Sequence, residues 1–97
     1  MNWNYITSIE NLNQLHEVSN TKSILIFKHS TACNISSMVL NRIESKWKNE
    51  YSESIIPYYL DLISYKSISN EISNRYQVIH ESPQVLIIRN GISVYDE

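Results

Sequence analysis

The chain has 97 residues, of which 42% are hydrophobic and 19% are charged, and its formal net charge is −2. This size and composition are typical of one soluble globular domain, so we expect a single domain over residues 1–97. The charges are interspersed and form no basic patch, which argues against nucleic-acid binding. The apolar runs are too short to span a bilayer, and the N-terminus lacks the features of a secretion signal. We therefore expect a cytoplasmic protein with no nucleic-acid or membrane partner.

The first half of the chain alternates helical and extended patterns. Residues 3–6 allow a short strand. Thr7 and Glu10 match a capping box, and apolar residues then recur at helical spacing, which predicts a helix over residues 8–19. After a polar loop, the continuous apolar run Ile24–Phe27 predicts a strand that is buried on both faces of a sheet.

The pattern returns to helical spacing after Cys33 and predicts a helix that ends near Asn49. Ile55–Leu62 is β-branched and aromatic, and it predicts a further strand. Pro57 must lie near the start of this strand or at a position that needs no ladder hydrogen bond. Apolar residues at helical spacing then predict a helix over residues 65–76.

The C-terminal part predicts a β-hairpin. Val85–Ile88 is an apolar strand, and residues 92–95 return as its partner. Asn90 and Gly91 form the preferred two-residue turn between them, because both positions tolerate positive φ. Strands and helices in this order predict an α/β fold whose parallel strands are closed by an antiparallel hairpin.

Cys33 is the only cysteine, so the chain can form neither an internal disulfide nor a cysteine-rich zinc site. The predicted elements place it where a buried strand ends and a helix begins. Free N–H groups and the dipole at a helix N-terminus favour the thiolate, which is the nucleophilic form. The alternative is an inert cysteine in the apolar core. The polar neighbours favour a helix start: Ser30, Thr31, Asn34, Ser36 and Ser37.

Two histidines are candidates for assisting this thiol. His29 follows the strand before Cys33, and His80 precedes the loop that contains Pro83, so an imidazolium at either position would favour the thiolate. The alternative for each is a solvated loop histidine. The spacing of these residues fits no usual zinc motif, so we expect no metal site. A Cys-His hydrolase would need an orienting third group, which the sequence does not offer.

Pro83 stands directly before the apolar strand of the hairpin. A loop proline is ordinarily trans, although X-Pro bonds adopt cis at low cost. With the element order, the segments FKHSTACNIS (Phe27–Ser36) and ESPQVLIIRNGISVY (Glu81–Tyr95) resemble the YtxJ-like family, the monothiol bacilliredoxins of the bacterial bacillithiol system. The resemblance extends from Trp3 to the C-terminus. It implies a thioredoxin-like fold with a central mixed sheet and helices on both faces.

The resemblance also implies roles for individual residues. Cys33 matches the single nucleophilic cysteine of the family, and Ser36 stands where dithiol thioredoxins carry the resolving cysteine. Pro83 matches a cis-proline that faces the active-site sulfur, and the backbone of Ser82 would pair with an extended thiol substrate. Thr31 belongs to the same signature without an assigned role.

Two departures from the superfamily pattern affect these expectations. Phe27 replaces the acidic residue that dithiol thioredoxins bury beneath the site, so that aid to proton transfer is missing. The sequence also stops at Glu97, directly after the hairpin. We therefore expect the final helix of the superfamily to be missing and one apolar sheet face to be partly open.

The implied activity is monothiol exchange. The Cys33 thiolate attacks a mixed disulfide between a client protein and a low-molecular-weight thiol, which for this family is bacillithiol. The expected partners are S-thiolated client proteins and the small thiol, which acts as a co-substrate, and no bound cofactor is expected. Two alternatives remain open: a non-catalytic thioredoxin-fold module that binds extended peptides beside Pro83, and a redox sensor in which Cys33 is modified without turnover.

Overall fold

The computed structural model describes residues 1–97. One five-stranded sheet has the order β1-β3-β2-β4-β5. β1, β3 and β2 are parallel, β4 is antiparallel to β2, and β5 is antiparallel to β4. The strands are β1 (Asn4–Tyr5), β2 (Ser23–His29), β3 (Ile55–Asp61), β4 (Gln84–Arg89) and β5 (Ile92–Asp96). The helices are α1 (Ile9–Val18), α2 (Asn34–Lys46) and α3 (Lys66–Tyr76), with a 3₁₀ turn, η1 (Asn49–Glu53).

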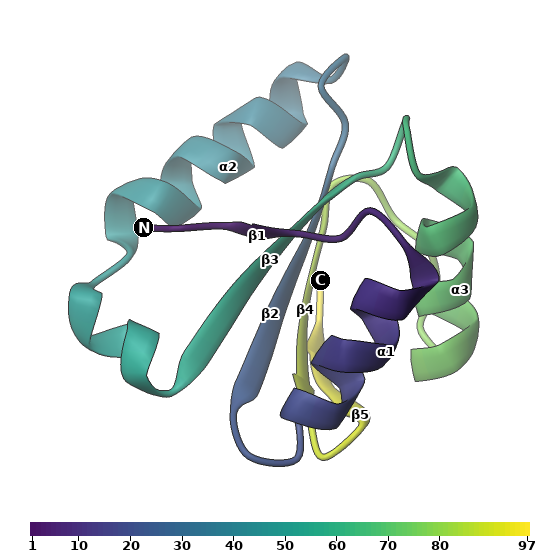
Figure 1. The fold of residues 1–97 in the computed structure, drawn as a ribbon. Coiled ribbons are helices and arrows are strands. Elements are labelled where there is room, and N and C mark those ends of the chain that lie inside the picture. The colour runs from purple at the N-terminus through teal and green to yellow at the C-terminus, as the bar shows by residue number, and fades with distance from the viewer.

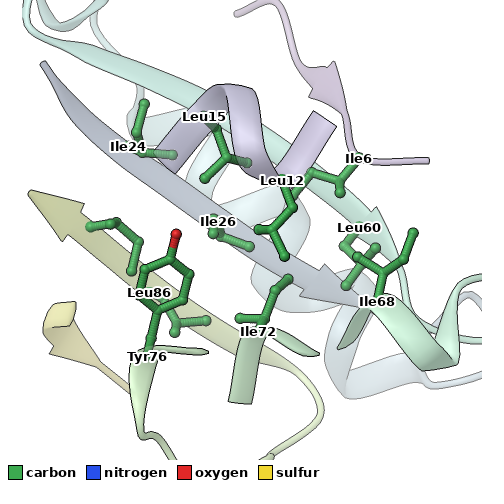
Figure 2. Close-up of a cluster of buried hydrophobic side chains, with 11 residues drawn as sticks. Ile6, Leu12, Leu15, Ile24, Ile26, Leu60, Ile68, Ile72, Tyr76 and Leu86 are labelled. Atoms are coloured by element: carbon green, nitrogen blue, oxygen red, sulfur yellow. The ribbon is translucent and has the colours of Figure 1, made fainter. Parts of the chain in front are cut away.

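Helices cover both faces of the sheet. α1 and α3 lie on one face and α2 lies on the other (Figure 1). The main core fills the space between the sheet and helices α1 and α3 (Figure 2). Its eleven buried side chains are Ile6, Leu12, Leu15, Ile24, Ile26, Leu60, Ile68, Ile72, Tyr76, Leu86 and Ile88.

β2 is buried on both faces, as its apolar run predicted. Side chains alternate along a strand, so Ile24 and Ile26 enter the main core while Leu25 and Phe27 face α2. The strand is longer than expected, because Lys28 and His29 continue it and are also buried.

Two helix boundaries differ from the sequence-based expectation. The N-cap of α1 is Ser8 rather than Thr7, because Ser8 Oγ accepts a hydrogen bond from the Asn11 N–H at 3.1 Å. The reciprocal bond runs from the Thr7 N–H to Asn11 Oδ1 at 3.0 Å. α2 ends at Lys46, before the predicted Asn49, because the backbone of Trp47 is extended.

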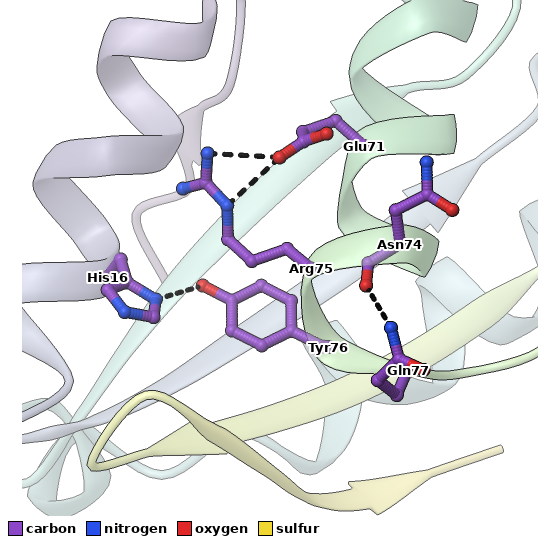
Figure 3. Close-up of polar contacts among 6 residues, drawn as sticks. All are labelled: His16, Glu71, Asn74, Arg75, Tyr76 and Gln77. Carbon is purple, nitrogen blue, oxygen red and sulfur yellow. Dashed lines mark hydrogen bonds and ion pairs between the residues drawn. The ribbon is translucent and has the colours of Figure 1, made fainter.

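The hairpin turn is docked on the C-terminal end of α1. Asn90 and Gly91 both have positive φ, as their sequence predicted. Their N–H groups donate to Ser19 O at 2.7 Å and to Ser19 Oγ at 2.9 Å. Next to this turn, His16 Nδ1 and Tyr76 Oη lie 2.9 Å apart and link α1 to the end of α3 (Figure 3).

The outer surfaces of α2 and β5 carry exposed apolar side chains: Ile35, Met38, Ile92, Val94 and Tyr95. No helix of the structure has the length and the apolar character needed to cross a membrane.

Candidate functional site

Cys33 occupies the N-cap position of α2, directly after the loop that leaves β2. It is partly exposed, and its side chain makes no capping hydrogen bond. The Cys33 N–H donates to Ser30 O at 3.1 Å, which closes a tight turn between the strand and the helix. The position is the strand-to-helix junction that the sequence predicted, and the thiol forms no disulfide.

The first turn of α2 offers an environment that suits negative charge. The first helical bond runs from the Ser37 N–H to Cys33 O, so the N–H groups of Asn34, Ile35 and Ser36 have no partner within the chain. No acidic side chain lies in this turn. Unpaired donors together with the helix dipole attract an anion at this end of the helix.

Ser36 connects α2 to the end of β2. Its hydroxyl is fully buried and lies 2.6 Å from His29 Nδ1, while the Ser30 N–H donates to the same oxygen at 3.0 Å. The Ser36 oxygen therefore accepts the Ser30 N–H and forms a second hydrogen bond with His29 Nδ1.

His29 is therefore not a solvated loop residue. It is the last residue of β2, only 4% exposed, and it packs between the rings of Phe27 and Tyr59 at centroid distances of 5.5 and 5.4 Å. The sequence placed it in a loop because its side chain is polar. Its hydrogen bond to Ser36, seven residues away, offsets the free-energy cost of burying the polar ring.

Phe27 lies in an aromatic cluster on the α2 face of the sheet. It is fully buried, and the rings of Trp3 and Tyr59 are 6.0 and 6.3 Å away. Trp3 Nε1 also donates to Glu44 Oε2 at 3.0 Å, which ties the N-terminal segment to α2. At the position where the resemblance implies a buried acid in dithiol thioredoxins, this chain has the apolar side chain of Phe27.

The Ser82–Pro83 peptide bond is cis, as the resemblance implied. Ser82 is exposed, and no hydrogen bond within the chain uses its N–H or its carbonyl. A groove of about 390 Å³ begins at Pro83 and runs between α2 and the β4–β5 hairpin. It is lined by Val39, Arg42, Ile43, Pro83, Gln84, Val85, Tyr95 and Glu97.

His80 is exposed, and its imidazole contacts side chains of β2 and α3. Its Nδ1 lies 3.3 Å from Lys28 Nζ and 3.3 Å from Ser69 Oγ. Desolvation, followed by the charges of Lys28 and Lys66, lowers the pKa of His80 below its ordinary value. Its hydrogen-bond partners therefore come from β2 and α3.

Lys28 is the main feature that the sequence analysis missed. Its side chain is fully buried, and desolvation lowers its pKa from 10.5 to about 8. Side chains of a strand point alternately to its two faces. Because Lys28 is two and four residues from Ile26 and Ile24, a β2 that extends to His29 places Lys28 on the same core face. Of the remaining expected site residues, Thr31 is exposed in the turn before Cys33. The structure contains no group of three or more side chains that could hold a metal ion.

The β2–Cys33–α2 junction, the cis-proline before β4 and the mixed sheet together define a protein of the thioredoxin fold. Solved structures agree with this class. A candidate oxidoreductase with a thioredoxin fold is 28% identical, with a TM-score of 0.80, over 96% of this chain and 79% of that one. Thioredoxin of Malassezia sympodialis is 18% identical, with a TM-score of 0.81, over 99% and 77%. Thioredoxin of Trypanosoma brucei brucei is 12% identical, with a TM-score of 0.76, over 99% and 77%. The last two show the fold alone.

The family is more specific than the fold. The model of the monothiol bacilliredoxin BrxC family matches residues 4–97. The chain belongs to this family, and the family and fold together indicate a function in thiol redox chemistry.

Proposed function

We propose that the protein is a monothiol disulfide exchanger that removes a low-molecular-weight thiol, bacillithiol by analogy with its family, from mixed disulfides on client proteins. The observation that carries the proposal is a single free thiol at the N-cap of α2, with a buried serine at the position of a resolving cysteine. We place the reaction in the bacterial cytoplasm, because low-molecular-weight thiols keep a single catalytic cysteine reduced there.

The reaction has two exchange steps. The Cys33 thiolate attacks the sulfur of the small thiol in the mixed disulfide, a new S–S bond forms, and the client sulfur leaves as a thiolate that takes a proton from solvent. Cys33 then carries the small thiol. A second molecule of low-molecular-weight thiol attacks this bond, the two small thiols leave as their own disulfide and Cys33 is released as a thiolate, so the electrons come from that thiol pool.

Ser36 explains why an outside thiol is needed. A serine hydroxyl cannot form a disulfide, so Cys33 has no partner within the chain. Ser82 supports the docking of a client, because its free and exposed backbone groups can pair with an extended segment beside Pro83.

The direct test follows the release of bacillithiol from a cysteine peptide that carries it in disulfide linkage. Cys33→Ser should abolish release, because the Cys33 thiolate is the group that attacks the disulfide. Ser36→Ala should retain most of the activity per folded molecule, because the serine hydroxyl takes no part in the exchange. Intact mass after the first step should show one small thiol attached to Cys33. Release by Cys33→Ser at the wild-type rate would refute the proposal.

The groove beside Pro83 supports one alternative, a module that binds extended peptides without chemistry. Covalent capture separates the two functions. After exposure to the mixed disulfide, an exchanger should carry the small thiol on Cys33 and release the peptide, because the thiolate attacks the disulfide. Reversible binding of the peptide with Cys33 left unmodified would favour the binding module.

A further inference from the structure

Lys28 is a buried cation without a counterion. Its Nζ lies 3.1 Å from Ser69 O, 3.2 Å from Ser73 Oγ and 3.3 Å from His80 Nδ1. No carboxylate pairs with it, since the salt bridge of the structure joins Arg75 to Glu71. Burying a charge in this way costs free energy, so the stability of the fold does not account for it.

The contacts of Lys28 join three parts of the molecule. The side chain starts from β2, directly before His29 and close in sequence to Cys33. Ser69 and Ser73 are one helical turn apart on α3 and so share a face of that helix. His80 belongs to the segment that connects α3 to β4, residues 77–83, which we call the proline loop.

Gln84 provides a second tie to the same loop. Lys28 and Gln84 are paired across β2 and β4, so their side chains leave the sheet on the same face. Gln84 Nε2 donates to Ile79 O at 2.8 Å, while its Oε1 is buried without a partner. Two neighbouring side chains of the sheet therefore hold two consecutive residues of the proline loop, Ile79 and His80.

We propose that Lys28 is a positioning residue that fixes the proline loop through His80 and thereby sets the place of Ser82 and Pro83 relative to Cys33. The proposal rests on the proposed function, because the position of this loop matters when a mixed disulfide docks on it. Lys28 acts through the loop and touches no reacting atom.

The contact depends on the protonation of His80. Its Nδ1 must be unprotonated to accept a hydrogen bond from the Lys28 ammonium. The charged groups that act on the imidazole are Lys28 from β2 and Lys66 from α3, and no carboxylate offsets them. A proton on His80 removes the acceptor for Lys28 and adds repulsion to its ammonium, so the contact with β2 is made at neutral pH and lost as the solution becomes acidic.

The first experiment needs no activity. The titration of the His80 imidazole is followed by NMR in the wild type, in Lys28→Met and in the matched control Lys66→Met, whose lysine is exposed and makes no hydrogen bond to His80. In Lys28→Met the pKa of His80 should rise toward its ordinary value, and the amides of residues 79–82 should exchange faster. In Lys66→Met the amide exchange should stay as in the wild type.

The second experiment links the loop to the substrate. With the bacillithiol-carrying peptide, Lys28→Met should raise KM about three- to tenfold, which is the effect of one lost hydrogen bond, with a smaller change in kcat. Lys66→Met should leave KM unchanged. Because acid removes the Lys28–His80 contact, the wild-type KM should rise below neutral pH, and this rise should be absent in Lys28→Met.

A pair of variants at exposed His80 covers the case in which Lys28→Met does not fold. His80→Leu removes the acceptor and should reproduce the rise in KM, whereas His80→Asn keeps an acceptor atom and should lie closer to the wild type. Unchanged His80 titration and loop exchange in Lys28→Met would overturn the proposal. Changed titration with an unchanged KM would overturn its substrate part. A wild type without exchange activity would instead overturn the proposed function, and the titration would still decide whether Lys28 holds the loop.

Discussion

At the scale of single residues, Ser36 has a structural role in addition to the one that the family resemblance implies for it. Its buried hydroxyl satisfies the Ser30 N–H and holds the imidazole of His29. Neither the Ser30 N–H nor His29 Nδ1 makes another hydrogen bond within the chain. The serine therefore joins the end of β2 to the first turn of α2. The residue that prevents an internal disulfide also fixes the turn that presents Cys33.

This role predicts a loss of stability in Ser36→Ala. Two polar groups would be left without a partner in a buried place, so the free energy of unfolding should fall by about 1–3 kcal/mol. Urea denaturation measures the change. The matched control is Ser45→Ala on the exposed part of the same helix, where we expect a change within about 0.5 kcal/mol. Equal effects of the two substitutions would contradict the role of Ser36.

At the scale of elements, the β4–β5 turn is placed by its fit against α1. Gly91 has a φ of 71°, and a Cβ at this position would lie 3.0 Å from His16 Cε1. The turn thus needs glycine both for its backbone conformation and for the closeness of the histidine ring.

Gly91→Ala should therefore lower the free energy of unfolding by about 1–3 kcal/mol, because both strain and crowding oppose the added methyl group. Asn90→Gly is the control: this neighbour also has positive φ, and glycine adopts that conformation freely. Thermal unfolding of both variants measures the difference. If the two variants unfolded at the same temperature, the docking of the turn on His16 would not restrict residue 91.

The same elements show how far local sequence determines the site. The order of strands and helices, the Asn90–Gly91 turn and the junction at Cys33 follow from patterns within a few residues, and all were predicted. The extension of β2 was not, because Lys28 and His29 are polar and their partners come from α3, the proline loop and α2. Burial of a polar residue depends on such distant partners, which one sequence does not reveal.

At the scale of the whole molecule, the two sheet faces differ in kind. The face under α1 and α3 holds the apolar core and, at its edge, the Lys28 contacts. The face under α2 holds the aromatic cluster and the His29–Ser36 bond. The end of β2 and the start of β4 are paired at Lys28 and Gln84. The turn before Cys33 is held by contacts on the α2 face, whereas the loop before Pro83 is held by contacts on the opposite face.

This arrangement predicts how stability depends on pH. The pKa of Lys28 is about 8 in the folded protein and 10.5 in the unfolded chain, so the unfolded chain binds more protons between these values. Stability should then rise with pH, by about 1.3 kcal/mol between pH 7 and pH 9. Burial raises the pKa values of Tyr58, Tyr59 and Tyr76 above the ordinary value of 10.0, so their contribution is present up to about pH 9 and is lost at higher pH. Urea denaturation from pH 7 to pH 9 therefore isolates the lysine.

Lys28→Met separates this effect from the rest of the protein. Methionine fills similar space without a charge, so the variant should be more stable than the wild type at pH 7, and the difference should shrink as pH rises. Lys66→Met, at an exposed site, should follow the wild-type curve. Parallel curves for Lys28→Met and the wild type would mean that the buried amine is not charged at pH 7. If Lys28→Met has a higher free energy of unfolding but faster amide exchange in the proline loop, the buried charge positions the loop and lowers the stability of the fold.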